Sequence, residues 1–80
     1  MSERIATAVF AALGRQLGQP AEAVQARANE GLDVLGLDSH GLMRVLLDIE
    51  QALGVSDLQL ADDALATPAS MVFGVVAAAG

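Results

Sequence analysis

The amino-acid sequence predicts an all-α fold, a small bundle of three longer helices and one short helix with a long first loop. Apolar residues recur at intervals of three and four along most of the chain, which is the spacing of one face of a helix. No stretch alternates apolar and polar residues as a half-buried strand would. With 80 residues, 54% of them hydrophobic, we expect a single domain over residues 1–80 with an aliphatic core.

The first helix is expected from about Ser2 to Leu17. Its apolar face carries Ile5, Val9, Leu13 and Leu17. Ser2 suits the N-cap, and Gly18 suits the position after the last turn. Gln19-Pro20 ends the helix, because proline lacks a backbone N–H and clashes with the preceding turn.

A long, mostly polar connection follows from Pro20 to Asp38, with a short turn expected over 21–28. Loops of this length are often functional, and apolar side chains must hold this one against the core. The candidate anchors are Val24, Leu32, Val34, Leu35 and Leu37. The acidic residues of the same loop, Glu22, Glu30 and Asp33, are expected to form a solvated face.

The second long helix is expected from Ser39 to Leu53, with Gly54 as the residue that ends it. Its core face carries Leu42, Val45, Leu46, Ile49 and Leu53. A short helix or turn is expected within 57–66. Thr67-Pro68 then predicts the N-cap and first residue of the last helix, which we expect to fray over 77–80.

The composition excludes several functions. Ten acidic residues, four arginines and no lysine give a net charge of −6, which disfavours nucleic acid and anionic membrane surfaces as partners. The chain has no cysteine, and its single histidine, His40, has no second histidine with which to bind a metal ion. No signal peptide is visible and the longest apolar run is too short to span a bilayer, so we expect a cytoplasmic monomer without membrane insertion.

Ser39 stands where a loop carrying Gly36 meets the second long helix. A hydroxyl there projects from a helix N-terminus, where free N–H groups and the helix dipole favour a negatively charged substituent. A catalytic serine is disfavoured, because Leu37 stands where a nucleophile elbow needs glycine and His40 points about 100° away around the helix. The alternative is that Ser39 is an ordinary N-cap, although Asp38 would suit that role one residue earlier.

The run Gly36-Leu37-Asp38-Ser39, with the apolar pattern of the helix that follows, resembles the attachment motif of acyl and peptidyl carrier proteins. The resemblance extends over nearly the whole chain and implies an acyl-carrier-like four-helix bundle. It implies that Ser39 carries a covalent 4′-phosphopantetheine arm, which a phosphopantetheinyl transferase installs from coenzyme A. It also implies that Asp38 helps the transferase to recognise the site, and that the protein is a carrier and not an enzyme.

A narrower resemblance concerns the cargo. Leu37-Asp38-Ser39-x-Gly41 and the run over 46–50 are similar to D-alanyl carrier proteins and related stand-alone aminoacyl carriers. This implies an aminoacyl thioester that an adenylating ligase loads and that an acyltransferase or condensing enzyme removes in a biosynthetic pathway. The alternatives are a polyketide or fatty acyl carrier, and, in another class, a small helical adaptor with unmodified Ser39.

Helical spacing from Ser39 leads to Met43 and Leu47 on the flank of the core face. In carrier proteins the helix after the serine generally recognises partners, so the resemblance implies that partner enzymes dock on this flank. The alternative is that both side chains pack against the long loop. Arg44 stands near a position that is acidic in many fatty-acid carriers, and together with His40 it implies a different set of partners. We expect Arg44 to pair with Asp48 one turn later.

Overall fold

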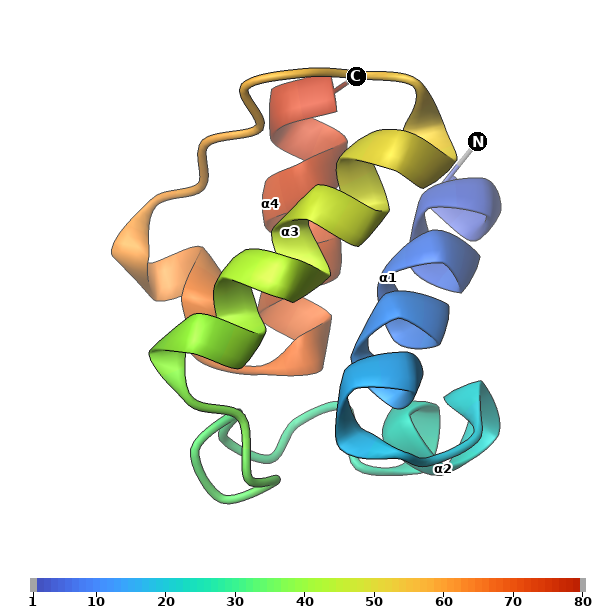
Figure 1. Ribbon diagram of the computed structural model, residues 1–80, viewed down its shortest axis with the longest axis vertical. Helices are drawn as coiled ribbons and strands as arrows, with labels where there is room; N and C mark the ends of the chain where they lie inside the picture. The colour runs from blue at the N-terminus through green and yellow to red at the C-terminus, as the bar shows by residue number, and fades with distance from the viewer. Residues whose placement is uncertain (1, 80) are drawn as a thin grey trace.

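The structure, a computed structural model, describes residues 2–79, and its regular elements are all helices. Its elements are α1 (Ser2–Leu17), α2 (Ala21–Ala26), α3 (Ser39–Leu53), the short 3-10 helix η1 (Asp62–Leu65) and α4 (Pro68–Ala79). The three long helices α1, α3 and α4 form the bundle, and α2 with the loop that follows it closes one end (Figure 1). The described residues contain no strand, so the all-α prediction is confirmed.

The core is aliphatic and draws on every long helix. Its buried side chains are Val9, Ala12, Leu13, Val24, Leu32, Leu35, Val45, Ile49, Met71 and Val75. On α3, Val45 and Ile49 are fully buried, whereas Leu42, Leu46 and Leu53 are half-buried at the edge of the same face. Burial of such apolar surface is the main term that stabilises a domain of this size.

Two backbone hydrogen bonds fasten the long loop to the start of α4. The Leu32 N–H donates to the Ala66 carbonyl at 2.9 Å, and the Ala69 N–H donates to the Ala28 carbonyl at 2.9 Å.

An ion pair lies within the loop itself. The Arg27 guanidinium donates to the Glu30 carboxylate at 2.7 and 3.0 Å, and this hydrogen bonding holds the pKa of the Glu30 carboxyl below its ordinary value.

The apolar anchors of the loop were mostly predicted correctly, with one exception. Val24, Leu32 and Leu35 are buried, and Leu37 packs against the core. The prediction was wrong for Val34, which is 66% exposed. The chain turns over 31–37, with the Leu35 N–H donating to the Gly31 carbonyl at 3.0 Å, so Leu32 and Leu35 face inward while Val34 between them faces outward.

The helix ends largely follow the local signals. Gly54 ends α3 in the left-handed conformation (φ 69°). Thr67 and Ser70 cap α4 reciprocally, because the Thr67 N–H donates to the Ser70 hydroxyl at 2.9 Å and the Ser70 N–H donates to the Thr67 hydroxyl at 3.0 Å. The predicted fraying over 77–79 was wrong, because this alanine run continues α4 to Ala79. The expected cap by Ser2 and the end of the chain at Gly80 lie outside the described side chains.

None of the helices in the part of the chain that the structure describes combines the length and the apolar composition that a bilayer span requires.

Candidate functional site

The loop before Ser39 contains a hydrogen-bonded turn around Gly36. Gly36 has φ 97°, a backbone conformation that side-chain-bearing residues rarely adopt. The turn around it is closed by the Gly36 N–H donating to the Asp33 carbonyl at 3.1 Å and the Leu37 N–H donating to the Leu32 carbonyl at 2.9 Å. Because Leu37 then packs against the core, the position of the next two residues is set on both sides, by this turn and by α3.

Asp38 is the N-cap of α3. Its backbone is extended (φ −94°, ψ 177°), and its Oδ1 accepts a hydrogen bond of 2.7 Å from the Gly41 N–H. Its carbonyl accepts from the Leu42 N–H at 2.9 Å, which begins the hydrogen bonding of the helix. The N-cap reading of Ser39 is therefore wrong, because the carboxylate one residue earlier takes that role.

Ser39 is the first helical residue and is exposed. Its hydroxyl takes part in none of the side-chain hydrogen bonds among the described residues. The backbone N–H groups of Ser39 and His40 precede the first i−4 carbonyl of α3, so they have no partner within the helix. The hydroxyl is thus accessible for modification in a local field that favours an anion.

His40 is exposed on the first turn of α3, and no hydrogen bond joins its ring to the Ser39 hydroxyl in the described part of the chain. A serine without a base in hydrogen-bond contact is a poor nucleophile.

A cleft of about 400 Å³ adjoins Ser39. Its walls come from the loop, the first turn of α3 and the end of η1. The lining residues are Leu32, Asp33, Leu37, Asp38, Ser39, Leu42, Leu65 and Ala66. The sequence reasoning missed Leu65 and Ala66, because their approach to Ser39 depends on the packing of η1 and no local signal reports it.

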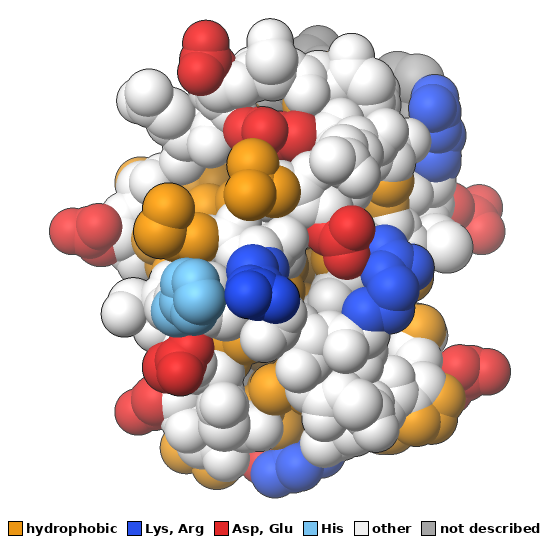
Figure 2. All heavy atoms as spheres, in the orientation of Figure 1, with side chains coloured by type: hydrophobic (Ala, Val, Ile, Leu, Met, Phe, Trp, Pro, Cys, Tyr) orange, Lys and Arg blue, Asp and Glu red, His pale blue; other side chains and the backbone are white. Residues whose placement is uncertain are grey.

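Two large apolar side chains of α3 face solvent on the flank beside Ser39. Met43 is 64% exposed and Leu47 is 56% exposed, so the alternative that they pack against the long loop is wrong. Figure 2 shows hydrophobic, histidine and arginine side chains gathered over α3 on this face of the molecule. We call the surface formed by His40, Met43, Arg44 and Leu47 the α3 face.

The charges of this region differ from the prediction. Asp48 does not pair with Arg44, because its Oδ2 accepts a hydrogen bond from Arg15 Nε at 3.0 Å. Arg15 reaches Asp48 because α1 packs alongside α3. Among the described residues, Arg44 has no carboxylate within ion-pair distance. The α3 face therefore presents an arginine and a histidine on a chain whose net charge is −6.

The described residues contain no cluster of three side chains able to hold a metal ion.

Residues 7–72 match the family model of the phosphopantetheine attachment site. The matched range extends from α1 into α4 and includes Asp38 and Ser39. No significant match was found among curated proteins or among solved structures.

Proposed function

The chain belongs to the phosphopantetheine attachment-site family, whose members carry 4′-phosphopantetheine covalently, and we propose that Ser39 is the residue that bears the arm. One observation carries this proposal. The Ser39 hydroxyl is exposed at the first position of α3. Because Asp38 caps the helix, the Ser39 hydroxyl is not needed for capping.

The surroundings of Ser39 fit the group. A phosphodiester at this hydroxyl places its negative charge beside the free N–H groups of Ser39 and His40. The adjoining cleft offers an apolar wall, with Leu37, Leu42 and Leu65, along which an arm can lie. When bound, the arm supplies the thiol that this cysteine-free chain lacks, and cargo is held on that thiol as a thioester.

Intact-mass measurement tests the attachment site. We expect the purified protein, incubated with coenzyme A, magnesium and a promiscuous phosphopantetheinyl transferase, to gain the mass of one phosphopantetheinyl group. Ser39→Ala should gain nothing, whereas Ser56→Ala, which removes another exposed serine, should gain the full mass. If Ser39→Ala is still modified, or if the unaltered protein is not, the assignment is wrong.

The cargo that we propose is an aminoacyl group and not a long fatty chain. The sequence similarity of the Ser39 region to stand-alone aminoacyl carriers supports this. The packing of the core supports it too, because Val45, Ile49 and Met71 are 0–1% exposed and a long fatty chain could enter the core only by displacing such side chains. An adenylating ligase would load the carrier, and an acyltransferase or condensing enzyme would unload it.

We propose that these enzymes dock on the α3 face, with Asp38 contributing to recognition by the transferase. Burial of one exposed side chain such as Leu47 is worth roughly 1.5–3 kcal/mol. Two such side chains fall short of the roughly 8 kcal/mol of a micromolar complex once association costs are counted. Brief encounters are what a carrier that visits several enzymes needs, and Arg44 favours partners with a carboxylate opposite it.

A further inference from the structure

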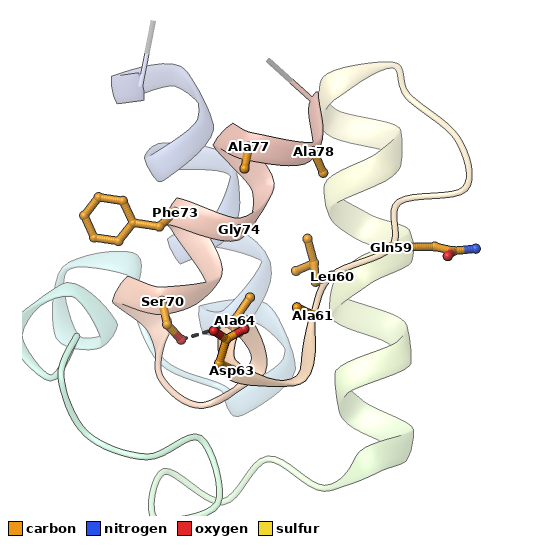
Figure 3. A pocket seen from close by; sticks show the side chains of 10 residues that line it. All are labelled: Gln59, Leu60, Ala61, Asp63, Ala64, Ser70, Phe73, Gly74, Ala77 and Ala78. Carbon is orange, nitrogen blue, oxygen red and sulfur yellow. Dashed lines mark hydrogen bonds between the residues drawn. The ribbon is translucent and has the colours of Figure 1, made fainter.

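A groove runs along the side of the molecule between residues 55–64 and α4. Its larger hollow, of about 540 Å³, lies between η1 and α4. A second hollow of about 450 Å³ adjoins it, because both are lined by Gln59 and Ala78. The larger hollow has a mainly apolar lining that includes Leu60, Ala61, Ala64, Gly74, Ala77 and Ala78. Figure 3 shows Leu60 on the segment that precedes η1, extending towards α4, and Ala64 on η1 near Ser70.

The floor of the groove is held rigidly. A Cβ on Gly74 would lie 2.6 Å from the Cβ of Ala64, so glycine allows η1 to pack directly against α4. The Ser70 hydroxyl donates to the Ala64 carbonyl at 2.9 Å and ties the same two elements together. The groove is therefore a preformed feature of the fold, which lowers the entropic cost of binding a partner there.

Phe73 stands at the rim of this groove. It is 75% exposed, the most exposed of the large apolar side chains, and it projects from α4 to the outside (Figure 3). It is one of only two aromatic residues in the chain. Aromatic side chains are enriched in interfaces because they bury a large area at low conformational cost.

The charge around the groove has one sign. Asp63 lines the larger hollow and Asp57 lines the second. Residues 45–80 include five acidic residues and no arginine, lysine or histidine, whereas all four arginines lie within residues 4–44. Electrostatic complementarity therefore selects a basic occupant and disfavours a second copy of this acidic chain.

We propose that this groove binds a basic amphipathic segment of a partner protein. Apolar side chains of that segment pack against Leu60 and Ala64 within the groove and against Phe73 at its rim, and a lysine or arginine lies opposite Asp57 or Asp63. The two hollows share no residue with α3 or with the cleft at Ser39. A partner held in the groove thus leaves Ser39 and the α3 face accessible to other enzymes.

Amide NMR shifts of the unmodified full chain test the binding. The probe is a synthetic amphipathic helix of leucine and lysine, compared with the same peptide carrying glutamate in place of each lysine. We expect the lysine peptide to shift the amides of Leu60, Ala64 and Gly74, and the glutamate peptide to shift none. Phe73→Ala should raise the Kd for the lysine peptide about tenfold, the equivalent of about 1.4 kcal/mol.

Met43→Ala is the matched control, because it removes an apolar side chain of similar exposure from the α3 face. It should leave the Kd unchanged, and circular dichroism should show that both variants keep their helices. The proposal is overturned if neither peptide binds, if both bind equally, if the shifts map to α3, or if Phe73→Ala binds as before. It is also overturned if these amides shift with protein concentration alone, since the occupant is then a second copy. Because the unmodified chain is used, none of these results depends on whether Ser39 carries the arm.

Discussion

Asp38 and Ser39 are adjacent but have separate structural roles. The carboxylate of Asp38 satisfies the Gly41 N–H at the start of α3, while the hydroxyl of Ser39 faces solvent. The sequence left open which of the two caps the helix, because aspartate and serine are both good N-caps and only backbone geometry decides between them. The difference matters, since modification of a capping serine would put the phosphodiester on the same oxygen that accepts a hydrogen bond at the start of the helix.

Substitutions of Asp38 separate its role in the fold from its proposed role in recognition. We predict that Asp38→Ala lowers the free energy of unfolding by about 1 kcal/mol, because the Gly41 N–H loses its acceptor. Asp38→Asn should keep nearly full stability, because asparagine is an equally good N-cap. Urea unfolding measures this difference.

The rate at which the transferase modifies Asp38→Asn tests whether Asp38 also contributes to recognition. If the transferase recognises the carboxylate, Asp38→Asn is modified several-fold more slowly than the unaltered protein while remaining as stable. An Asp38→Asn variant modified at the normal rate would show that Asp38 serves only the helix.

At the scale of the element, α3 was predicted with its observed bounds, Ser39–Leu53. Its start, its end and its apolar face follow from nearby residues in the sequence, namely Asp38, Gly54 and the spacing of Val45 and Ile49. The contacts made by the flank of α3 depend instead on segments that are distant in the sequence. Whether Met43 and Leu47 meet the long loop or solvent depends on where the loop runs, and the fold leaves both exposed.

The α3 face gives a prediction for docking. We expect Leu47→Asp to slow loading by the adenylating ligase at least several-fold, because it places a charge where an apolar side chain is proposed to be buried. Its helicity and Tm should change little, since Leu47 is already 56% exposed. Gln51→Asp, one turn further along α3 and also exposed, is the control and should load normally. A large drop in Tm for Leu47→Asp would instead indicate that Leu47 supports the core.

At the scale of the whole molecule, the sequence predicts the all-α bundle but few of the contacts between distant segments. The Arg15–Asp48 pair joins α1 to α3, and the local alternative with Arg44 was the reasonable expectation from spacing alone. Phe73 is similar, because α4 packs against α1 and η1 while the ring of Phe73 remains 75% exposed. Such features depend on how helices meet, which apolar periodicity does not encode.

Cargo burial is a property of the whole bundle and gives a further prediction. A promiscuous transferase can attach alanyl- or octanoyl-phosphopantetheine directly from the matching coenzyme A thioester. We expect both products to leave the methyl NMR shifts of Val45, Ile49 and Met71 unchanged, because these side chains are packed with 0–1% exposure. Shifts of these methyl groups with octanoyl cargo alone would mean that the core opens for a fatty chain, and would overturn the aminoacyl assignment.

The capping of α3 by Asp38 has a last consequence, for how partners read the state of the carrier. The Ser39 hydroxyl takes part in none of the side-chain hydrogen bonds of the described residues, so attachment there, as proposed, would break none of them. An enzyme that distinguishes an empty carrier from a loaded one would then have to contact the arm or its cargo as well as the protein surface.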